Sequence, residues 1–285
     1  MASKKSSWAK FPHDQKTYDF SGDKLKKAWP ALHSGDGEPY PDDKRAAILI
    51  KAAGKSAPKS LSAEDLASQL QQAWAAYHHG DFQQAFELSE VLGPVGASVA
   101  CKALGIHSTY LVDDEGEQLK RFEQAGKLAE AAMVALPNEA NSHYRYAFAM
   151  GRYSQGISIV KAIKLGLASK VRKALEKTLE LSPKHAEAQT GLALYHAEII
   201  NKIGAMIGGM TYGAKASEAE KLMTSALKLA PDSPIAHLEH GNMLMLLYGD
   251  KKEDAAADAI EKASKLKPKD AMEKLDAEHA KAQLE

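Results

Sequence analysis

The sequence predicts an all-α fold built from repeated helix pairs, and three observations indicate it. From about residue 61 onward the chain is rich in Ala, Leu, Glu, Lys and Gln, with apolar residues at helical spacing and no sustained alternation. Four segments end an apolar helix, turn at a proline and restart with a small residue: VALPNEA, LELSPKHAEA, LKLAPDSPIA and SKLKPKDA. Small residues also recur at fixed distances from these prolines, which is typical of helices packed closely in a repeat.

The first sixty residues differ in composition from the rest. They carry 12 Lys and Arg against 7 Asp and Glu, and six of the chain's nineteen aromatic residues: Trp8, Phe11, Tyr18, Phe20, Trp29 and Tyr40. Such a segment is too aromatic for a disordered tail, and its prolines break up any long helix. We therefore predict an N-terminal extended arm over residues 1–60, laid either along its own chain or into another molecule, and a repeat domain over residues 61–285.

The repeat domain begins with the stretch LASQLQQAWAAYHHGDFQQAFELSEVLGP. Ser62 is the expected N-cap of its first helix, and Gly80-Asp81-Phe82 the expected turn before the second. A weaker helix pair follows, with its turn at residues 113–116. The highly charged end DAMEKLDAEHAKAQLE suits a terminal capping helix.

The later pairs align on their prolines. The prolines are Pro137, Pro183, Pro231 and Pro268, and the helices are expected to restart at Ala140, Ala186, Pro234 and Ala271. Residues that are mostly small precede each proline by five and by twelve positions: Ala132, Thr178, Ala226 and Ala263, and Ala125, Val171, Ala219 and Ala256. The eighth residue of a restarted helix is also small, at Ala147, Ala193 and Gly241. This pattern resembles the tetratricopeptide repeat (TPR), which predicts a right-handed helical solenoid.

The proline spacings exceed the usual repeat of about 34 residues. Counted from Pro94 to Pro137 and then between the four prolines above, they are 43, 46, 48 and 37 residues. The sequence therefore predicts elongated helix pairs with extra residues at 154–169 and 200–215. The second insert contains GGMTYGAK, which has two glycines at P-loop spacing but has Ala214 where the lysine belongs. We therefore expect it to end a lengthened helix and to supply a turn, rather than to bind phosphate.

Residues 120–285 also resemble two known families. The stretch from AFAMGRYSQGISIVKAIKLGLASKVRK to LALYHAEI, a Gly-rich insert with Thr211 and Tyr212, and EAEKLMTSALKLAPDSP are similar to the helical domain of the regulator-of-microtubule-dynamics family. They are also similar to TPR proteins associated with tripartite (TRAP) transporters. Both resemblances imply a solenoid that binds other molecules and is not an enzyme.

Composition argues against several function classes. The 37 basic and 37 acidic residues do not favour nucleic acid as a partner. The single cysteine, Cys101, is expected to be a packed thiol, and the N-terminus lacks the apolar region of a secretory signal. His237-Leu238-Glu239-His240 matches no zinc-protease motif, and these histidines are expected to be structural. We predict no catalytic, cofactor or metal site, no membrane span, and a cytoplasmic location.

The TPR alignment predicts which residues line a concave groove. They are Asn141, Tyr144, Phe148 and Arg152, then Glu187, Thr190, Leu194 and Glu198, then Ile235, Leu238, Asn242 and Met245. These side chains would suit a peptide or an apolar ligand. The alternative is that the inserts fold back and fill the groove, which leaves these residues as core.

Three lysines, Lys170, Lys173 and Lys177, share one helix face. They could contact an anionic group of a partner, or they could form an ordinary solvated face.

The predicted function is therefore that of a scaffold or adaptor that binds a partner protein or peptide in its groove. One alternative is a protein that binds a small apolar or anionic ligand. Another is a structural subunit that forms an oligomer through residues 1–60.

Overall fold

The computed structural model describes residues 8–59 and 61–285, and every regular element in them is a helix. The chain forms two compact units. Of the described residues, the first unit comprises those up to Ala28 and those in Pro39–Ile159, and the second comprises Trp29–Glu38 and Val160–Glu285. The predicted boundary at residue 60 lies inside the first unit.

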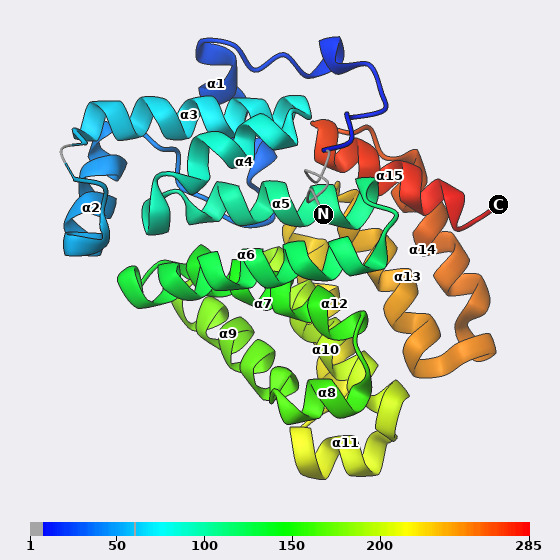
Figure 1. The fold of residues 1–285 in the computed structure, drawn as a ribbon. Helices are drawn as coiled ribbons and strands as arrows, with labels where there is room; N and C mark the ends of the chain where they lie inside the picture. The colour runs from blue at the N-terminus through cyan, green and yellow to red at the C-terminus, as the bar shows by residue number, and fades with distance from the viewer. Residues whose placement is uncertain (1–7, 60) are drawn as a thin grey trace, which may run out of the picture. The chain divides into compact units, whose positions relative to one another are not determined.

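The first unit is a stack of helices in which each packs on the next in the chain. The helices are α2 (Asp43–Ala53), α3 (Ala63–His79), α4 (Phe82–Glu90), α5 (Ala97–Leu111), α6 (Glu115–Ala135) and α7 (Ala140–Gln155). Contacts also join α3 to α5 and α5 to α7, so alternate helices touch. Figure 1 shows α3, α5 and α6 as successive, nearly parallel layers.

The second unit repeats this pattern of contacts. Its helices are α8 (Ile159–Lys164), which begins at the unit boundary, α9 (Leu167–Leu181), α10 (Ala186–Ile203), α11 (Ala205–Tyr212), α12 (Ala216–Leu229), α13 (Pro234–Tyr248), α14 (Glu253–Lys265) and α15 (Ala271–Ala282). Helix α10 contacts α12 and α13, and α13 contacts both α14 and α15. The predicted restarts at Ala140, Ala186, Pro234 and Ala271 are confirmed, because each is the first residue of a helix.

The periodic small residues are buried where helices meet. In the second unit Ala193, Ala219 and Ala256 belong to one core cluster. At Gly241 of α13, a methyl group would lie 2.9 Å from the carbonyl oxygen of Ala256 in α14 and 2.6 Å from Cγ1 of Ile260. The backbones approach so closely that no side chain fits there, which is the packing the sequence predicts.

Side chains also brace the proline turns, a feature that we did not predict. His143 Nε2 donates to the carbonyl of Pro137 at 2.8 Å, and His237 Nε2 donates to that of Pro231 at the same distance. Gln189 Nε2 donates to the carbonyl of Pro183 at 2.9 Å. Each donor lies six residues after its proline, so three equivalent turns are closed by the same bond.

The two inserts form separate short helices, which corrects the expectation of a lengthened helix. Helix α10 ends at Ile203, and Gly204, at φ +80°, breaks the chain before α11. GGMTYGAK is thus the second half of α11 and the turn after it. Gly213 ends α11 in the left-handed region at φ +64°, which confirms that this glycine provides backbone freedom. In the other insert, α8 lies between α7 and α9.

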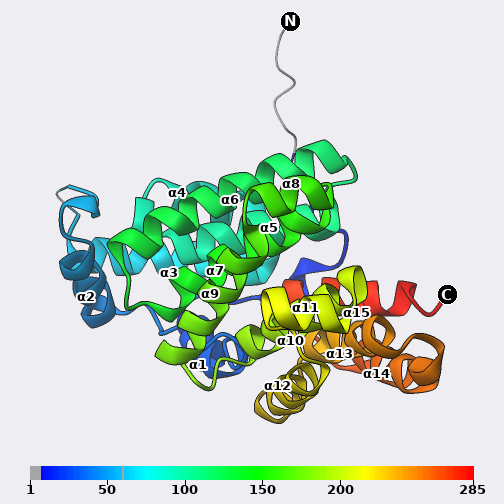
Figure 2. The same ribbon diagram turned by 90° about the horizontal axis from the view of Figure 1, so that it is seen from below.

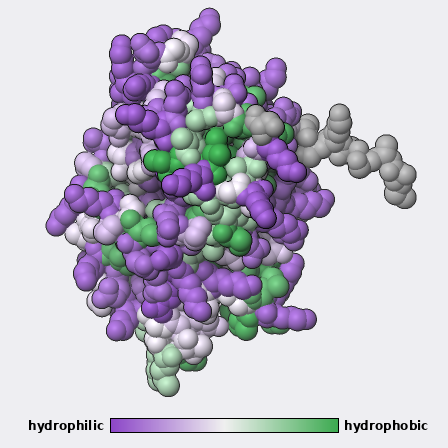
Figure 3. Space-filling view, turned by 90° about the vertical axis from the view of Figure 1, so that its left-hand side faces the viewer, coloured by the Kyte–Doolittle hydropathy of each residue, from purple (hydrophilic) through white to green (hydrophobic). Residues whose placement is uncertain are grey.

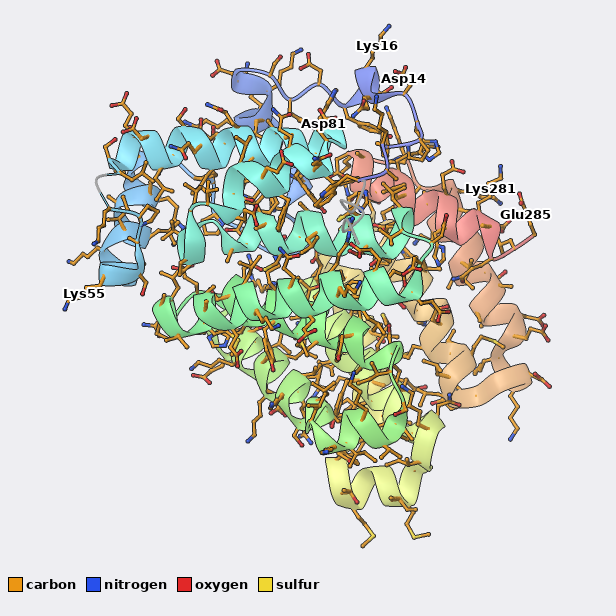
Figure 4. All side chains as sticks on the ribbon, in the orientation of Figure 1. Asp14, Lys16, Lys55, Asp81, Lys281 and Glu285 are labelled. Carbon is orange, nitrogen blue, oxygen red and sulfur yellow. The ribbon has the colours of Figure 1, made fainter. Side chains whose placement is uncertain are left out.

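Two α-helices lie in the described part of the region for which we expected an extended arm. They are α1 (Asp23–Leu32) and α2, and the division between the units falls within α1. Residues 8–20 belong to the first unit and pack against its helices. Phe11 lies 6.5 Å from Phe82 between ring centroids, and Gln15 Nε2 donates to the Asp81 carboxylate at 2.9 Å. Figure 4 labels Asp81 at the α3–α4 turn and the two neighbours of Gln15 in the chain.

Candidate functional site

The predicted groove residues of the first unit lie on α7. Asn141 and Tyr144 are buried, whereas Phe148 and Arg152 are half-buried. Phe148 packs on α5, since a methyl group at Gly105 would lie only 2.3 Å from Cε1 of its ring. The Arg145 guanidinium lies 5.3 Å from the centre of the Tyr144 ring. Tyr144 and Phe148 therefore contribute to the packing of this unit.

The other eight predicted residues lie on α10 and α13, which pack together in the second unit. Thr190 and Leu238 are buried, and Met245 is exposed. The remaining five are half-buried: Glu187, Leu194, Glu198, Ile235 and Asn242. This pair of helices thus carries partly exposed apolar groups next to carboxylate and amide groups.

A turn of the chain's own backbone lies at the start of α10. The Glu187 N–H donates to the carbonyl of Gly35 at 3.0 Å. A methyl group at Gly35 would lie 3.2 Å from Cγ of Glu187, so the two segments are in close contact. One of the predicted groove residues is therefore in contact with residues 29–38 of the same unit.

Residues 29–38, which comprise the end of α1 and the turn after it, have a compact internal structure. His33 Nδ1 lies 2.8 Å from the Asp36 carboxylate, and both side chains are almost fully buried. The Trp29 indole N–H donates to the carbonyl of Glu38 at 2.7 Å, and the rings of Trp29 and His33 lie 4.0 Å apart. These bonds hold Gly35 in position against α10.

The predicted lysine face lies on α9. Lys170 and Lys173 are exposed, whereas Lys177 Nζ forms an ion pair with Glu180 at 2.6 Å. At least one of the three lysines is thus engaged within its own helix, as expected of an ordinary solvated face.

The reactive side chains that the sequence singled out have structural contacts. Cys101 is fully buried, its thiol donates to the carbonyl of Ala125 at 3.2 Å, and burial raises its pKa to about 12. It is therefore a packed thiol, as predicted. Burial lowers the pKa of His237 and His240, which favours the neutral form of both imidazoles. Among the described residues, no group of three or more His, Cys, Asp or Glu is placed to hold a metal ion.

A buried cluster that we did not predict fixes residues 8 and 9 to α5 and α6. The His107 ring lies 4.4 Å from that of Trp8, and its Nε2 donates to the carbonyl of Ala9 at 3.1 Å. Arg121 Nη1 donates to His107 Nδ1 at 2.8 Å, and its guanidinium lies 4.7 Å from the Trp8 ring centre. The aromatic composition of residues 1–60 indicates that they pack against other residues, but it does not indicate which side chains they contact.

The GGMTYGAK stretch does not have the geometry of a phosphate loop. Gly208 and Gly209 lie inside α11, and Lys215 is the residue before α12. A P-loop instead places its glycines in a loop that precedes a helix, with the backbone N–H groups turned toward phosphate.

None of the helices described here combines the length and the apolar character needed to cross a bilayer. Models of known protein families do not match the chain, and no curated protein matches it significantly. The assignment to a family therefore stays a prediction.

Proposed function

We propose that this protein is a non-enzymatic TPR-like scaffold that binds a partner protein or peptide on the face formed by α10 and α13. The helix contacts support the repeat part of this proposal, because each helix touches the next and, in several cases, the next but one. The buried small residues and the three braced turns recur with the same register. Recurrent local contacts of this kind are what a stacked array requires.

The contact between Glu187 and Gly35 carries the functional part of the proposal. It joins the start of α10 to a non-helical stretch of backbone through a main-chain hydrogen bond. In this proposal, the rest of the face would accept a segment of another protein as the start of α10 accepts the chain's own turn. Leu194, Ile235 and Met245 would supply apolar anchors beyond this contact, while Glu198 and Asn242 would orient the ligand.

A comparative pull-down tests this function. Wild type is compared with Leu194→Ala/Met245→Ala, which removes two apolar groups of the face, and with Val91→Ala/Val134→Ala as a matched control. Val91 and Val134 are exposed apolar residues of the first unit, outside the predicted face. Circular dichroism and a thermal melt verify that all three proteins are folded.

We expect wild type and the control variant to capture the same protein partner. The face variant should bind this partner at least about tenfold more weakly, which corresponds to about 1.4 kcal/mol of binding free energy. If the face variant captures the same proteins as wild type, the proposed site is wrong. Native mass spectrometry of the purified protein then distinguishes the small-ligand alternative, because a bound ligand would add a defined mass.

A further inference from the structure

Large apolar side chains are exposed on the two insert helices, α8 and α11. On α11 the exposed fractions are 77% for Met206, 59% for Ile207 and 84% for Met210, and on α8 they are 72% for Val160 and 58% for Ile163. Monomeric soluble proteins bury most such residues, and exposed apolar groups gathered in one place mark interaction sites.

Both inserts lack acidic residues. The sequence contains no Asp or Glu from 140 to 175 or from 199 to 217, although the chain as a whole has equal numbers of acidic and basic residues, 37 of each. Exposed basic residues lie within or beside the inserts, among them Lys164 and Lys215, whereas Lys202 forms an ion pair with Glu198 at 3.6 Å. The charged residues within these two stretches of sequence are therefore all basic, and Lys164 and Lys215 are exposed beside the apolar groups.

Helix α11 is held firmly despite its exposure. The carbonyl of Tyr212, its last residue, accepts hydrogen bonds from Arg172 Nη1 of α9 at 2.5 Å and from the Tyr195 hydroxyl of α10 at 3.2 Å. The bonds from two neighbouring helices fix the end of α11, so its methionines project from a rigid base.

The two insert helices lie at the same end of the second unit. In Figure 1 both α8 and α11 are at the lower end, and in Figure 2, seen from below, both face the viewer. In Figure 3 the lowest part of the surface is pale green and white, which marks apolar and weakly polar residues, whereas most of the visible surface is purple.

We infer that α8 and α11 insert into the headgroup region of an anionic phospholipid membrane. Helix α11 has eight residues and α8 has six, so they are about 12 Å and 9 Å long, too short to cross about 30 Å of hydrocarbon. Short apolar helices flanked by lysines suit the interface, where the apolar groups enter the acyl boundary and the ammonium groups contact lipid phosphate.

A second copy of the chain fits this surface less well. Joining two copies through these helices would bring like charges together, which is unfavourable. An anionic lipid surface, in contrast, satisfies both the apolar groups and the positive charge. This inference is independent of the proposed function, because it uses neither the face of α10 nor that of α13.

Vesicle flotation tests the inference on the full-length chain. Binding is measured to vesicles of phosphatidylcholine alone and to vesicles in which about a third of the lipid is phosphatidylserine. The tip variants are Met206→Ser/Met210→Ser and Val160→Ser/Ile163→Ser, and the matched control is Val91→Ser/Val134→Ser, whose two residues are 72% and 81% exposed. All these side chains are at least 58% exposed, so the substitutions leave the core intact.

We expect wild type and the control to bind phosphatidylserine vesicles at least tenfold more tightly than neutral vesicles, and each tip variant to lose at least tenfold of that binding. Raising the salt concentration weakens the binding of wild type. The inference is wrong if wild type fails to float with anionic vesicles, or if the tip variants float equally well. It is also wrong if wild type does not float and sedimentation shows a dimer that Met206→Ser/Met210→Ser dissociates, because a second copy then covers the surface.

Discussion

The stability of the first unit depends on keeping His107 neutral. Its ring is fully buried, with Nε2 donating to the carbonyl of Ala9 and Nδ1 accepting from Arg121. A proton added at Nδ1 would remove the second bond and would place a positive charge beside the guanidinium. Burial, aided by the charge of Arg121 and opposed by the bond to Ala9, lowers the pKa of His107 to about 4 from 6.5.

The pKa difference sets the size and the sign of the effect. Below pH 6.5 the unfolded chain binds a proton at His107 that the folded chain does not bind until about pH 4. The stabilisation that the neutral His107 gives the folded state is therefore fully present above pH 6.5 and is lost as the pH falls toward 4. A difference of about 2.5 pKa units corresponds to about 3 kcal/mol of unfolding free energy.

The measurement compares wild type with His107→Gln in urea denaturation at pH values from 7.5 to about 4. A glutamine amide can also donate to Ala9 and accept from Arg121, but it does not titrate. The free energy of unfolding of the variant is subtracted from that of wild type, which removes the contribution of every other titrating group. We expect wild type to lose about 3 kcal/mol of unfolding free energy relative to the variant as the pH falls. A difference that stays constant would refute the neutral, buried imidazole.

Three further predictions follow from local contacts. Gly241→Ala should destabilise the protein by about 1–3 kcal/mol, because the new methyl group meets the Ala256 carbonyl. Gly151→Ala is the control, because the methyl position there is open space, and it should be neutral or stabilising by up to about 1 kcal/mol. Gln189→Ala should cost about 1 kcal/mol through loss of its bond to the turn proline. Burial raises the pKa of Glu273 from 4.5 to about 7, so the folded state binds this proton more tightly than the unfolded state. Stability is therefore lost as the pH rises from about 4.5 to about 7, and Glu273→Gln should remove that loss.

Urea denaturation followed by circular dichroism measures all three. Equal effects of Gly241→Ala and Gly151→Ala would contradict the close approach of α13 and α14. A Gln189→Ala protein as stable as wild type would show that the bond at this turn contributes nothing. For Glu273→Gln, a pH dependence unchanged from wild type would mean that this carboxyl is not held protonated by its buried site.

Much of the helical framework could be predicted from local sequence. The prolines end helices because they lack an N–H donor, and the predicted restarts at Ala140, Ala186, Pro234 and Ala271 are the first residues of their helices. Ser62 caps α3, as predicted, by accepting a hydrogen bond from the Asp65 N–H. The recurrent small residues predicted close packing, because only small side chains allow two backbones to approach.

The site could be predicted less well. Alignment of the repeat brought the α10 and α13 residues onto two packed helices, but the sequence did not show that Phe148 packs on Gly105 or that Gly35 lies against Glu187. Because those contacts join residues that are far apart in the chain, no local sequence pattern predicts them.

The sequence by itself determined the helical class, the turns and the register of the small residues, because propensity, capping and proline geometry act over a few neighbouring residues. Only the tertiary structure decided three other features. It separates α11 from α10 at Gly204, it packs the aromatic groups of residues 8–20 against α3, α4 and α5, and it leaves the methionines of α11 exposed. These outcomes depend on which surfaces contact each other in the folded chain, because the burial of a side chain is set by its tertiary contacts and not by its residue type alone.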